Sequence, residues 1–326
     1  MALTKVLGGY AMNDQNIPVV DAHHHLWVHD ADRFLCDELY GDIKTSGYNV
    51  QSTVFIECKS MYRRHGPEEF QPVGEMEFAN GCGALGESTV LGPTHICAAI
   101  VGRADLALGD RVKGVLEKLC EAGGERIRGI RYITSHVPEV KVEASKDLML
   151  DRKFQEGFAC LKEFHLRFDS WQYHPQLPQL LTLLRTAPDI PVVINHAGGL
   201  IGMGSFAARR EEAIADWRRS LTALAALPNV YLKLGAFSMP VFALTPDMPK
   251  GEEHLTVFAE RVRPLMETCI EIFGVRRCMF ESNFPVSRNK YTYKETWDIL
   301  NMASRGFSLS ERQRLFAGTA REFYAI

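Results

Sequence analysis

Short runs of β-branched and other apolar residues alternate along the chain with longer segments in which apolar residues recur at helical spacing. Runs of the first kind predict buried strands, and segments of the second kind predict amphipathic helices. The expected strands are Val19–Ala22, Thr53–Cys58, Ile96–Val101, Ile127–Ile133, Leu166–Trp171, Pro191–Asn195, Val230–Leu234 and Arg277–Phe280. The expected helices are Val73–Cys82, Asp110–Ala122, Lys153–Phe164, Leu177–Thr186, Arg209–Leu227, Glu252–Phe273, Thr292–Ala303 and Ser310–Tyr324. Eight strands that alternate with helices predict an α/β fold, a closed (β/α)8 TIM barrel.

The order of these elements also limits the domain organisation. An open, doubly wound sheet is the competing fold, and it normally carries a glycine-rich turn after its first strand, where this chain has histidines. No low-complexity linker divides the chain. We therefore expect residues 1–17 to form an N-terminal extension and residues 18–326 a single barrel domain with a C-terminal helix. The stretches Ala79–Pro93 and Ala236–Gly251, which contain glycine and proline, are expected to be loops.

Composition argues against several classes of protein. The 326 residues are 46% hydrophobic with a formal net charge of −3, so nothing favours binding to nucleic acid or to an acidic membrane surface. The eight cysteines include no Cys-x-x-Cys pair, which argues against zinc fingers and thiol redox motifs. No apolar stretch has the length of a signal-peptide core or a membrane span. A reducing, cytoplasmic location is the expectation that follows.

Three adjacent histidines follow the first expected strand, in the sequence VVDAHHHLW. Strand side chains alternate between two faces, so if Asp21 points into the barrel, His23 and His25 do as well, and His24 points towards the helices. Active sites of such barrels lie at the carboxyl ends of the strands. Two imidazoles directed at one point there suit a cation such as zinc. A hydrated histidine loop without chemistry is the alternative.

Two further histidines follow later strands. His196 comes after an apolar run and precedes two glycines, so it should emerge at the same rim as the first pair. It is a candidate ligand or general base, and a packed core histidine is the alternative. His174 lies just past the fifth strand, before a proline, where it either reaches the site or caps the loop.

Charged and polar side chains end three other strands. Arg131 lies near the end of the fourth strand, where a guanidinium suits a substrate carboxylate or lactone oxygen; an internal ion pair is the alternative. Glu57 ends the second strand with Lys59 on the same face, so it either forms a buried Glu–Lys pair or contacts substrate or metal. The eighth strand ends in MFESNFPV, which places Glu281 and Asn283 on one face.

The motifs VVDAHHHLW, RGIRYI, LRFDSWQYHPQLPQLL, VVINHAGG, NVYLKLG and MFESNFPV together resemble the amidohydrolase superfamily, over residues 18 to 322. The branch they resemble is the amidohydrolase-related group that includes sugar and dicarboxylate lactonases. His23 and His25 match a pair that binds metal in many members, and His196 matches the strand-six histidine. The resemblance implies one divalent metal ion, with zinc expected, at His23, His25 and His196. No lysine ends the fourth strand where binuclear members bridge two metals, so we exclude a binuclear site.

Asn283 stands where many members have an aspartate that activates the attacking water. An amide neither accepts a proton near neutral pH nor adds a negative ligand to a metal, although it can orient water or substrate. Either Glu281 or Glu57 then acts as the base, or the mechanism differs. Because the resembled branch includes members that work without metal, the alternative is a metal-free site in which protonated imidazoles stabilise the oxyanion.

The resemblance implies a hydrolase that opens a small lactone or related carboxylate by attack of activated water on the carbonyl carbon. The expected catalytic residues are His196, Asn283 and Glu281, and the residues expected to bind an anionic or hydroxylated small-molecule substrate are Arg131, His174 and Glu57. A metal-dependent decarboxylase and a catalytically inactive, ligand-binding barrel are the alternatives. Assembly into a homo-oligomer is left open.

Overall fold

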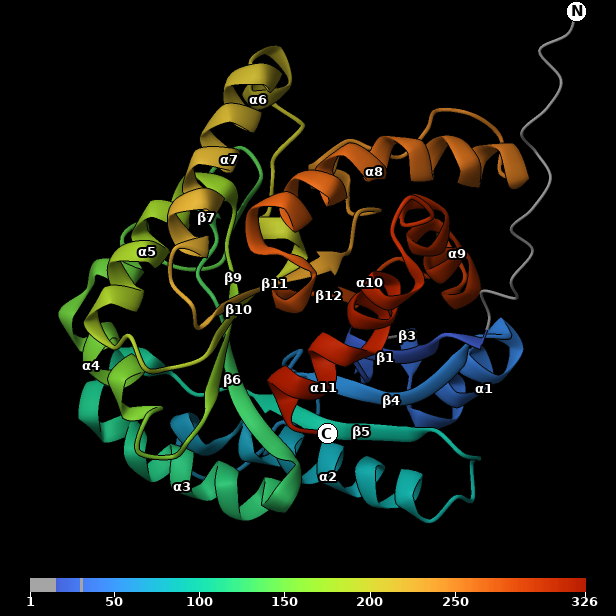
Figure 1. Cartoon of the computed structure of the whole chain (residues 1–326). Helices are drawn as coiled ribbons and strands as arrows, with labels where there is room; N and C mark the ends of the chain where they lie inside the picture. Colours follow the sequence, from blue (N-terminus) through green and yellow to red (C-terminus); the bar gives the residue numbers. More distant parts are fainter. Residues whose placement is uncertain (1–15, 30–31) are drawn as a thin grey trace, which may run out of the picture.

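The computed structural model describes residues 16–29 and 32–326, so most of the expected N-terminal extension lies outside the described residues. Eight parallel strands form one sheet in the order β1-β4-β5-β6-β9-β10-β11-β12. Figure 1 shows them in a ring with helices around the outside. The strands are β1 Pro18–His24, β4 Asn49–Ile56, β5 His95–Gly102, β6 Ile127–Ile133, β9 Arg167–Trp171, β10 Val192–Ile194, β11 Val230–Gly235 and β12 Cys278–Glu281. The predicted barrel and its eight strands are confirmed.

Helices follow the strands as the apolar spacing predicts, with a few differences. The helices are α1 Cys36–Ser46, α2 Val73–Glu87, α3 Val112–Gly123, α4 Arg152–Cys160, α5 Leu177–Thr186, α6 Ser205–Ala208, α7 Arg210–Ala225, α8 Glu252–Phe273, α9 Tyr293–Ala303, α10 Leu309–Gln313 and α11 Thr319–Tyr324. Helices α1 and α6 were not predicted, and the predicted helix Ser310–Tyr324 is divided into α10, a π-helical segment and α11. Helix α2 runs through most of the predicted loop 79–93, because Gly83 and Gly86 let it pack closely: a Cβ on Gly86 would lie 2.9 Å from Ile96 N on β5.

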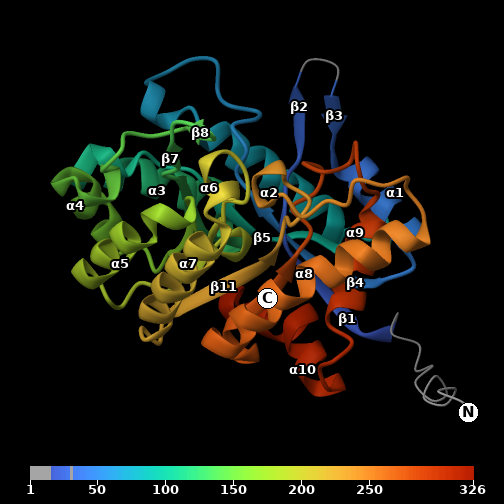
Figure 2. The same ribbon diagram turned by 90° about the horizontal axis from the view of Figure 1, so that it is seen from above.

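Two antiparallel pairs extend beyond the barrel. They are β2 Trp27–His29 with β3 Asp32–Phe34, and β7 His136–Val137 with β8 Lys141–Val142. Both follow the carboxyl ends of barrel strands, and Figure 2 shows the β2–β3 hairpin standing out from the body on the side of β7 and β8. Among the described residues, no helix is both long and apolar enough to cross a membrane.

The barrel interior is apolar towards the amino-terminal ends of the strands. Small and branched side chains from strands around the ring form one buried cluster with residues of α11, which covers the amino-terminal end of the barrel. The cluster contains Val20, Ala22, Val54, Ile56, Ala99, Val101, Val193, Met279, Ala317, Ala320, Phe323 and Tyr324. The buried histidines and Glu281 lie beyond this cluster, towards the carboxyl ends of the strands.

Asp21 lies at the seam where the first and last strands meet. It accepts hydrogen bonds from Ser282 N at 2.9 Å, from Ser282 Oγ at 2.6 Å and from the hydroxyl of Tyr293 on α9 at 3.0 Å. Burial raises the pKa of Asp21 to about 6 despite these bonds. The carboxylate thus faces the helices and joins β1 to β12, which corrects the premise that it points into the barrel.

An irregularity in β1 explains why the histidines nevertheless keep their expected sides. The pairing register with β4 shifts between Asp21 and His24, so simple alternation does not apply across this stretch. His24 contacts Thr53 Oγ1 at 2.8 Å and the ring of Phe55, which belongs to the core between strands and helices. His24 therefore faces outward, and burial lowers its pKa to about 3.

Candidate active site

His23 and His25 meet at the carboxyl end of β1. Their Nε2 atoms lie 3.2 Å apart and both side chains are buried. His25 Nδ1 lies 2.8 Å from the Ile56 carbonyl, which can only accept, so His25 carries its proton on Nδ1 and presents a lone pair at Nε2. The His23 Nε2 atom opposite it therefore either donates a proton to His25 or shares a cation with it.

His196 and Glu281 form a second buried pair beside the first. His196 Nδ1 lies 2.6 Å from Glu281 Oε1, and the His196 backbone N–H donates to the same oxygen at 3.1 Å. The other carboxylate oxygen, Oε2, lies 2.9 Å from His23 Nδ1. A carboxylate that accepts from Nδ1 leaves the His196 Nε2 lone pair available to a ligand or a proton.

These groups converge although the chain brings them from different strands. Ligand atoms of His23, His196 and Glu281 all lie within 4.8 Å of one another, and the rings of His23 and His196 have centroids 4.8 Å apart. His25 lies on another side of His23, at the same centroid distance. The rings of Trp171 and His196 pack in a T-shaped arrangement with their centroids 4.5 Å apart, which limits the rotation of the His196 ring.

Burial lowers the pKa of His23 and of His25 well below the ordinary value, and neighbouring positive charges, Lys233 for His23 and Arg131 for both, lower them further. Both imidazoles are therefore neutral at neutral pH. Neutral imidazoles can bind a metal ion, whereas the metal-free alternative requires imidazolium groups. At His23 and His25 the direction of these pKa shifts therefore fits metal ligands better than oxyanion-stabilising imidazolium groups.

Asn283 follows Glu281 on the same strand end but has different contacts. Its backbone N–H donates to His23 O at 2.8 Å, and its side-chain Nδ2 approaches Met239 Sδ at 3.6 Å. Asn283 Oδ1 is buried and has no hydrogen-bond partner among the described residues. The carboxylate nearest the histidines is thus that of Glu281, two residues before the position where the superfamily has aspartate.

Arg131 and Glu57 pair with each other. Arg131 Nε donates to Glu57 Oε1 at 2.8 Å, and Nη2 donates to the Glu57 carbonyl. The ion pair considered for Arg131 is present. The Glu–Lys pair considered for Glu57 is wrong, because the side chain of Lys59 is half exposed and lies 3.5 Å from Glu143. Glu57 Oε2 has no hydrogen-bond partner among the described residues.

Glu75 is a buried carboxyl group that the sequence did not single out. It comes from α2 and accepts hydrogen bonds from Cys58 N and Ser60 N, both at 2.9 Å, so it holds the turn after β4 in place. Burial raises the pKa of Glu75 to about 8, with a smaller contribution from the charge of Glu57. A neutral carboxyl therefore supports the loop beside Glu57.

His174 has its contacts elsewhere. Its Nδ1 accepts from Ile201 N at 3.2 Å, and its ring packs edge-on against Phe206. It lines a separate cavity of about 230 Å³ with residues of α6 and α7, among them Phe206 and Asp216. Burial lowers its pKa to about 4. Of the two positions considered for His174, these contacts fit the one in the loop.

Lys233 and Asp169 are functional candidates that the sequence reasoning missed. Both are fully buried, and Lys233 Nζ lies 2.7 Å from Asp169 Oδ2 and 3.3 Å from His23 Nδ1. A signal was present, because NVYLKLG places a single lysine inside an otherwise apolar strand, and RFDSW places Asp169 in the interior of a strand, between Arg167 and Trp171. Burying a charge in a barrel core is costly unless it has a partner.

Comparison with known proteins places this geometry in a family. The amidohydrolase family model matches residues 20–326. An uncharacterised protein, y4mH of Sinorhizobium fredii, is 28% identical over 328 residues, with 95% of this chain and 99% of that protein covered. An L-fucono-1,5-lactonase of Burkholderia multivorans is 29% identical over 230 residues, with 70% of this chain and 72% of the relative covered.

A solved structure shares the fold. It is an amidohydrolase from Burkholderia multivorans with bound zinc, which superposes with a TM-score of 0.72 at 22% identity and covers 94% of this chain and 99% of that chain. The barrel fold, the histidines at the carboxyl end of the barrel and the family match over nearly the whole chain all point to the same family. The chain belongs to the amidohydrolase family.

Proposed function

We propose that this protein hydrolyses a hydroxylated lactone, with His23, His25 and His196 holding one divalent cation and Glu281 orienting His196. The observation that carries the proposal is the buried His196–Glu281 pair beside the facing Nε2 atoms of His23 and His25. The lactonase relative supports the substrate class.

The spacing of His23 and His25 fits two ligands of one zinc ion. Zinc binds imidazole nitrogen at about 2.0–2.1 Å in tetrahedral geometry, which separates two ligand nitrogens by roughly 3.3 Å. The Nε2 atoms of His23 and His25 are 3.2 Å apart. Glu281 lies on the Nδ1 side of His23 and His196, the usual place for a carboxylate that orients metal-binding histidines. When bound, zinc polarises a carbonyl group and makes water more acidic.

The chain's own residues supply the remaining chemistry. His196 Nε2 accepts the proton of the attacking water as the water oxygen bonds to the carbonyl carbon, and it returns this proton to the ring oxygen when the lactone C–O bond breaks. In between, the Glu281 carboxylate, 2.6 Å from Nδ1, stabilises the imidazolium. The same Nε2 cannot bind the cation and take this proton at once, so during the attack the cation would be held by His23 and His25 alone. Asn283 Oδ1, buried without a partner, is available to accept from water or a substrate hydroxyl.

Unpartnered polar atoms near the carboxyl ends of the strands favour a substrate with several hydroxyl groups. Buried side-chain atoms without hydrogen-bond partners among the described residues include Glu57 Oε2, Tyr62 Oη, Arg103 Nη1, Thr134 Oγ1, Ser135 Oγ, Gln172 Nε2 and Asn283 Oδ1. Buried polar groups normally have partners, so ordered water or a bound molecule that displaces it is expected to supply them. The set mixes donors and acceptors, which matches hydroxyl groups better than carboxylates, because carboxylates only accept.

The test is a lactone panel with the zinc-loaded full chain. Sugar 1,5-lactones are compared with an unsubstituted six-membered lactone and with aromatic carboxylates, and both acid release and CO₂ release are measured. We expect acid release, fastest with the sugar lactones. Stoichiometric CO₂ would instead support a decarboxylase, and no turnover with any lactone would reject the proposal.

Two variants identify the residues involved. Glu281→Gln keeps the shape of the side chain but removes its charge, so we expect a loss in kcat of about 10²–10⁴, the range for impaired acid–base catalysis. The control is Glu117→Gln, which alters an exposed residue on α3. Asn283→Asp should lower activity if the site is built around the amide; a gain in activity or in bound metal would indicate an inactive, ligand-binding barrel.

A further inference from the structure

Lys233 is an ammonium group held inside the barrel by several contacts. Its partner Asp169 also accepts from the Tyr324 hydroxyl at 2.9 Å and from Asn195 Nδ2 at 3.2 Å, both to the oxygen that binds Lys233. Three donors to one buried carboxylate leave it little freedom to move. The position of the Lys233 ammonium is therefore set by β9, β10 and α11 together.

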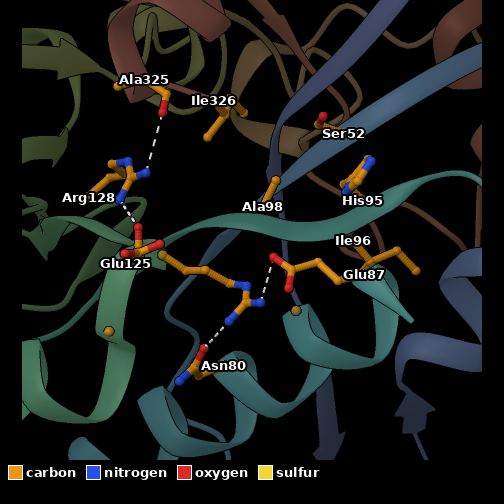
Figure 3. Close-up of a pocket in the computed structure, with 13 residues that line it drawn as sticks. Ser52, Asn80, Glu87, His95, Ile96, Ala98, Glu125, Arg128, Ala325 and Ile326 are labelled. Atoms are coloured by element: carbon orange, nitrogen blue, oxygen red, sulfur yellow. Dashed lines mark hydrogen bonds and ion pairs between the residues drawn. The ribbon is translucent and has the colours of Figure 1, made fainter. Parts of the chain in front are cut away.

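The segment that carries Tyr324 is itself fixed. Figure 3 shows Arg128 linked to the Ala325 carbonyl at the amino-terminal end of the barrel, beside a cavity of about 560 Å³. The same guanidinium donates through Nε to the Tyr324 carbonyl at 2.7 Å. Tyr324 thus holds its hydroxyl against Asp169 from a firmly bound backbone.

Another contact of Lys233 favours one tautomer of His23. Lys233 Nζ can only donate and lies 3.3 Å from His23 Nδ1, so in this hydrogen bond Nδ1 accepts and the ring proton of His23 lies on Nε2. His23 Nε2 then donates to His25 Nε2 at 3.2 Å, and His25 Nδ1 donates to Ile56 O at 2.8 Å. The hydrogen bonds from Lys233 to His23, from His23 to His25 and from His25 to Ile56 are therefore all compatible with one another.

Glu281 competes for the same nitrogen. Its Oε2 is nearer to His23 Nδ1, at 2.9 Å, but Oε2 has no aligned hydrogen-bond partner among the described residues. A cation held by His23 Nε2 needs a lone pair on that atom, which moves the ring proton to Nδ1, towards Glu281. The hydrogen bond from Lys233 is then lost, and its charge also repels the cation.

We propose that Lys233 is a positioning residue that keeps His23 and His25 together in the metal-free protein and lowers the affinity of the site for a divalent cation. This inference rests on the cation site of the proposed function but not on its substrate. A merely structural lysine predicts the opposite sign, because its removal would loosen the site and weaken metal binding.

The test compares two variants that share one change. Asp169→Asn keeps Lys233, whereas Lys233→Met/Asp169→Asn removes it without leaving an unpaired buried carboxylate. Zinc affinity is measured for both full-length proteins, with zinc alone, by competition with a chromophoric chelator at one pH. We expect the double variant to bind zinc about tenfold more tightly, the order expected when a competing charge-assisted hydrogen bond is removed. Equal or weaker binding overturns the inference, whether or not any lactone is hydrolysed.

A second measurement does not depend on the variants folding. Long-range ¹H–¹⁵N spectra of the metal-free, histidine-labelled wild type report which ring nitrogen carries the proton. The His23 signal is assigned by its absence in His23→Gln. A proton on Nε2 supports the inference, and a proton on Nδ1 rejects it.

Discussion

Glu75 allows a test of the structure that needs no substrate. The Glu75→Gln variant replaces the buried carboxyl by an amide of the same shape, whose oxygen can still accept from Cys58 N and Ser60 N. What it removes is the ability to ionise. The variant should therefore change the pH dependence of stability much more than the fold.

The sign and size follow from the pKa. In the folded protein the pKa of Glu75 is about 8, above its ordinary value of 4.5, so the folded state holds a proton that the unfolded state releases. The stability due to this group is fully present below pH 4.5 and is lost as the pH rises through 8. Well inside that window each pH unit costs about 1.4 kcal/mol, and the slope flattens as the pH approaches the pKa. The wild type should therefore lose about 2 kcal/mol between pH 6 and pH 8 through Glu75 alone.

The assay is urea unfolding at pH 6 and pH 8 for the wild type, Glu75→Gln and the exposed control Glu117→Gln. The change in unfolding free energy from pH 6 to pH 8 is compared between the proteins, because this comparison cancels the contributions of the titrating groups that they share. We expect the pH-dependent loss to be about 2 kcal/mol smaller in Glu75→Gln than in the wild type and in the control. Equal losses in all three proteins would refute the assignment of a neutral, buried carboxyl to Glu75.

Two further predictions concern the site. In Gly235→Ala the new Cβ would lie 2.1 Å from Glu281 O and 2.4 Å from Glu281 Cγ. We therefore expect the unfolding free energy to fall by about 1–3 kcal/mol and the activity to be reduced. A fully active, stable variant would contradict the packing between β11 and β12. Zinc at 100 times its dissociation constant should stabilise the protein by about 2.7 kcal/mol in urea unfolding and alter the fluorescence of Trp171, whose ring contacts His196. The fluorescence change should disappear in Trp171→Phe, and zinc that neither stabilises the protein nor alters its fluorescence would argue against a site at His196.

The barrel was predictable because buried parallel strands and amphipathic helices leave separate patterns in a sequence. The predicted bounds of Leu177–Thr186 and Glu252–Phe273 agree with the structure to the residue. Helix α1 escaped notice because its buried stripe contains only Leu39 and Ile43 as large apolar residues, with Cys36 and Ser46 completing it. With so few large apolar residues, the helical spacing of hydrophobic positions is hard to recognise among the polar residues around it.

The sequence predicted which residues form the site better than it predicted how they are arranged. Alternation assigned His23, His24 and His25 to their observed sides, but from a wrong premise about Asp21, because an irregular register cannot be seen in one sequence. The partner of Glu57 was also beyond reach. Lys59 shares its strand, whereas Arg131 is 74 positions away and meets Glu57 only once the barrel forms.

The seam at Asp21 has a consequence for the order in which the molecule is made. Ser282 and Asp21 are 261 positions apart; Asp21 lies in the first strand of the ring, and Ser282 directly follows the last. A ribosome has therefore to deliver nearly the whole polypeptide before the two edges can join. Catalytic competence should consequently arise abruptly, at the end of synthesis, rather than accumulate as successive β/α units emerge.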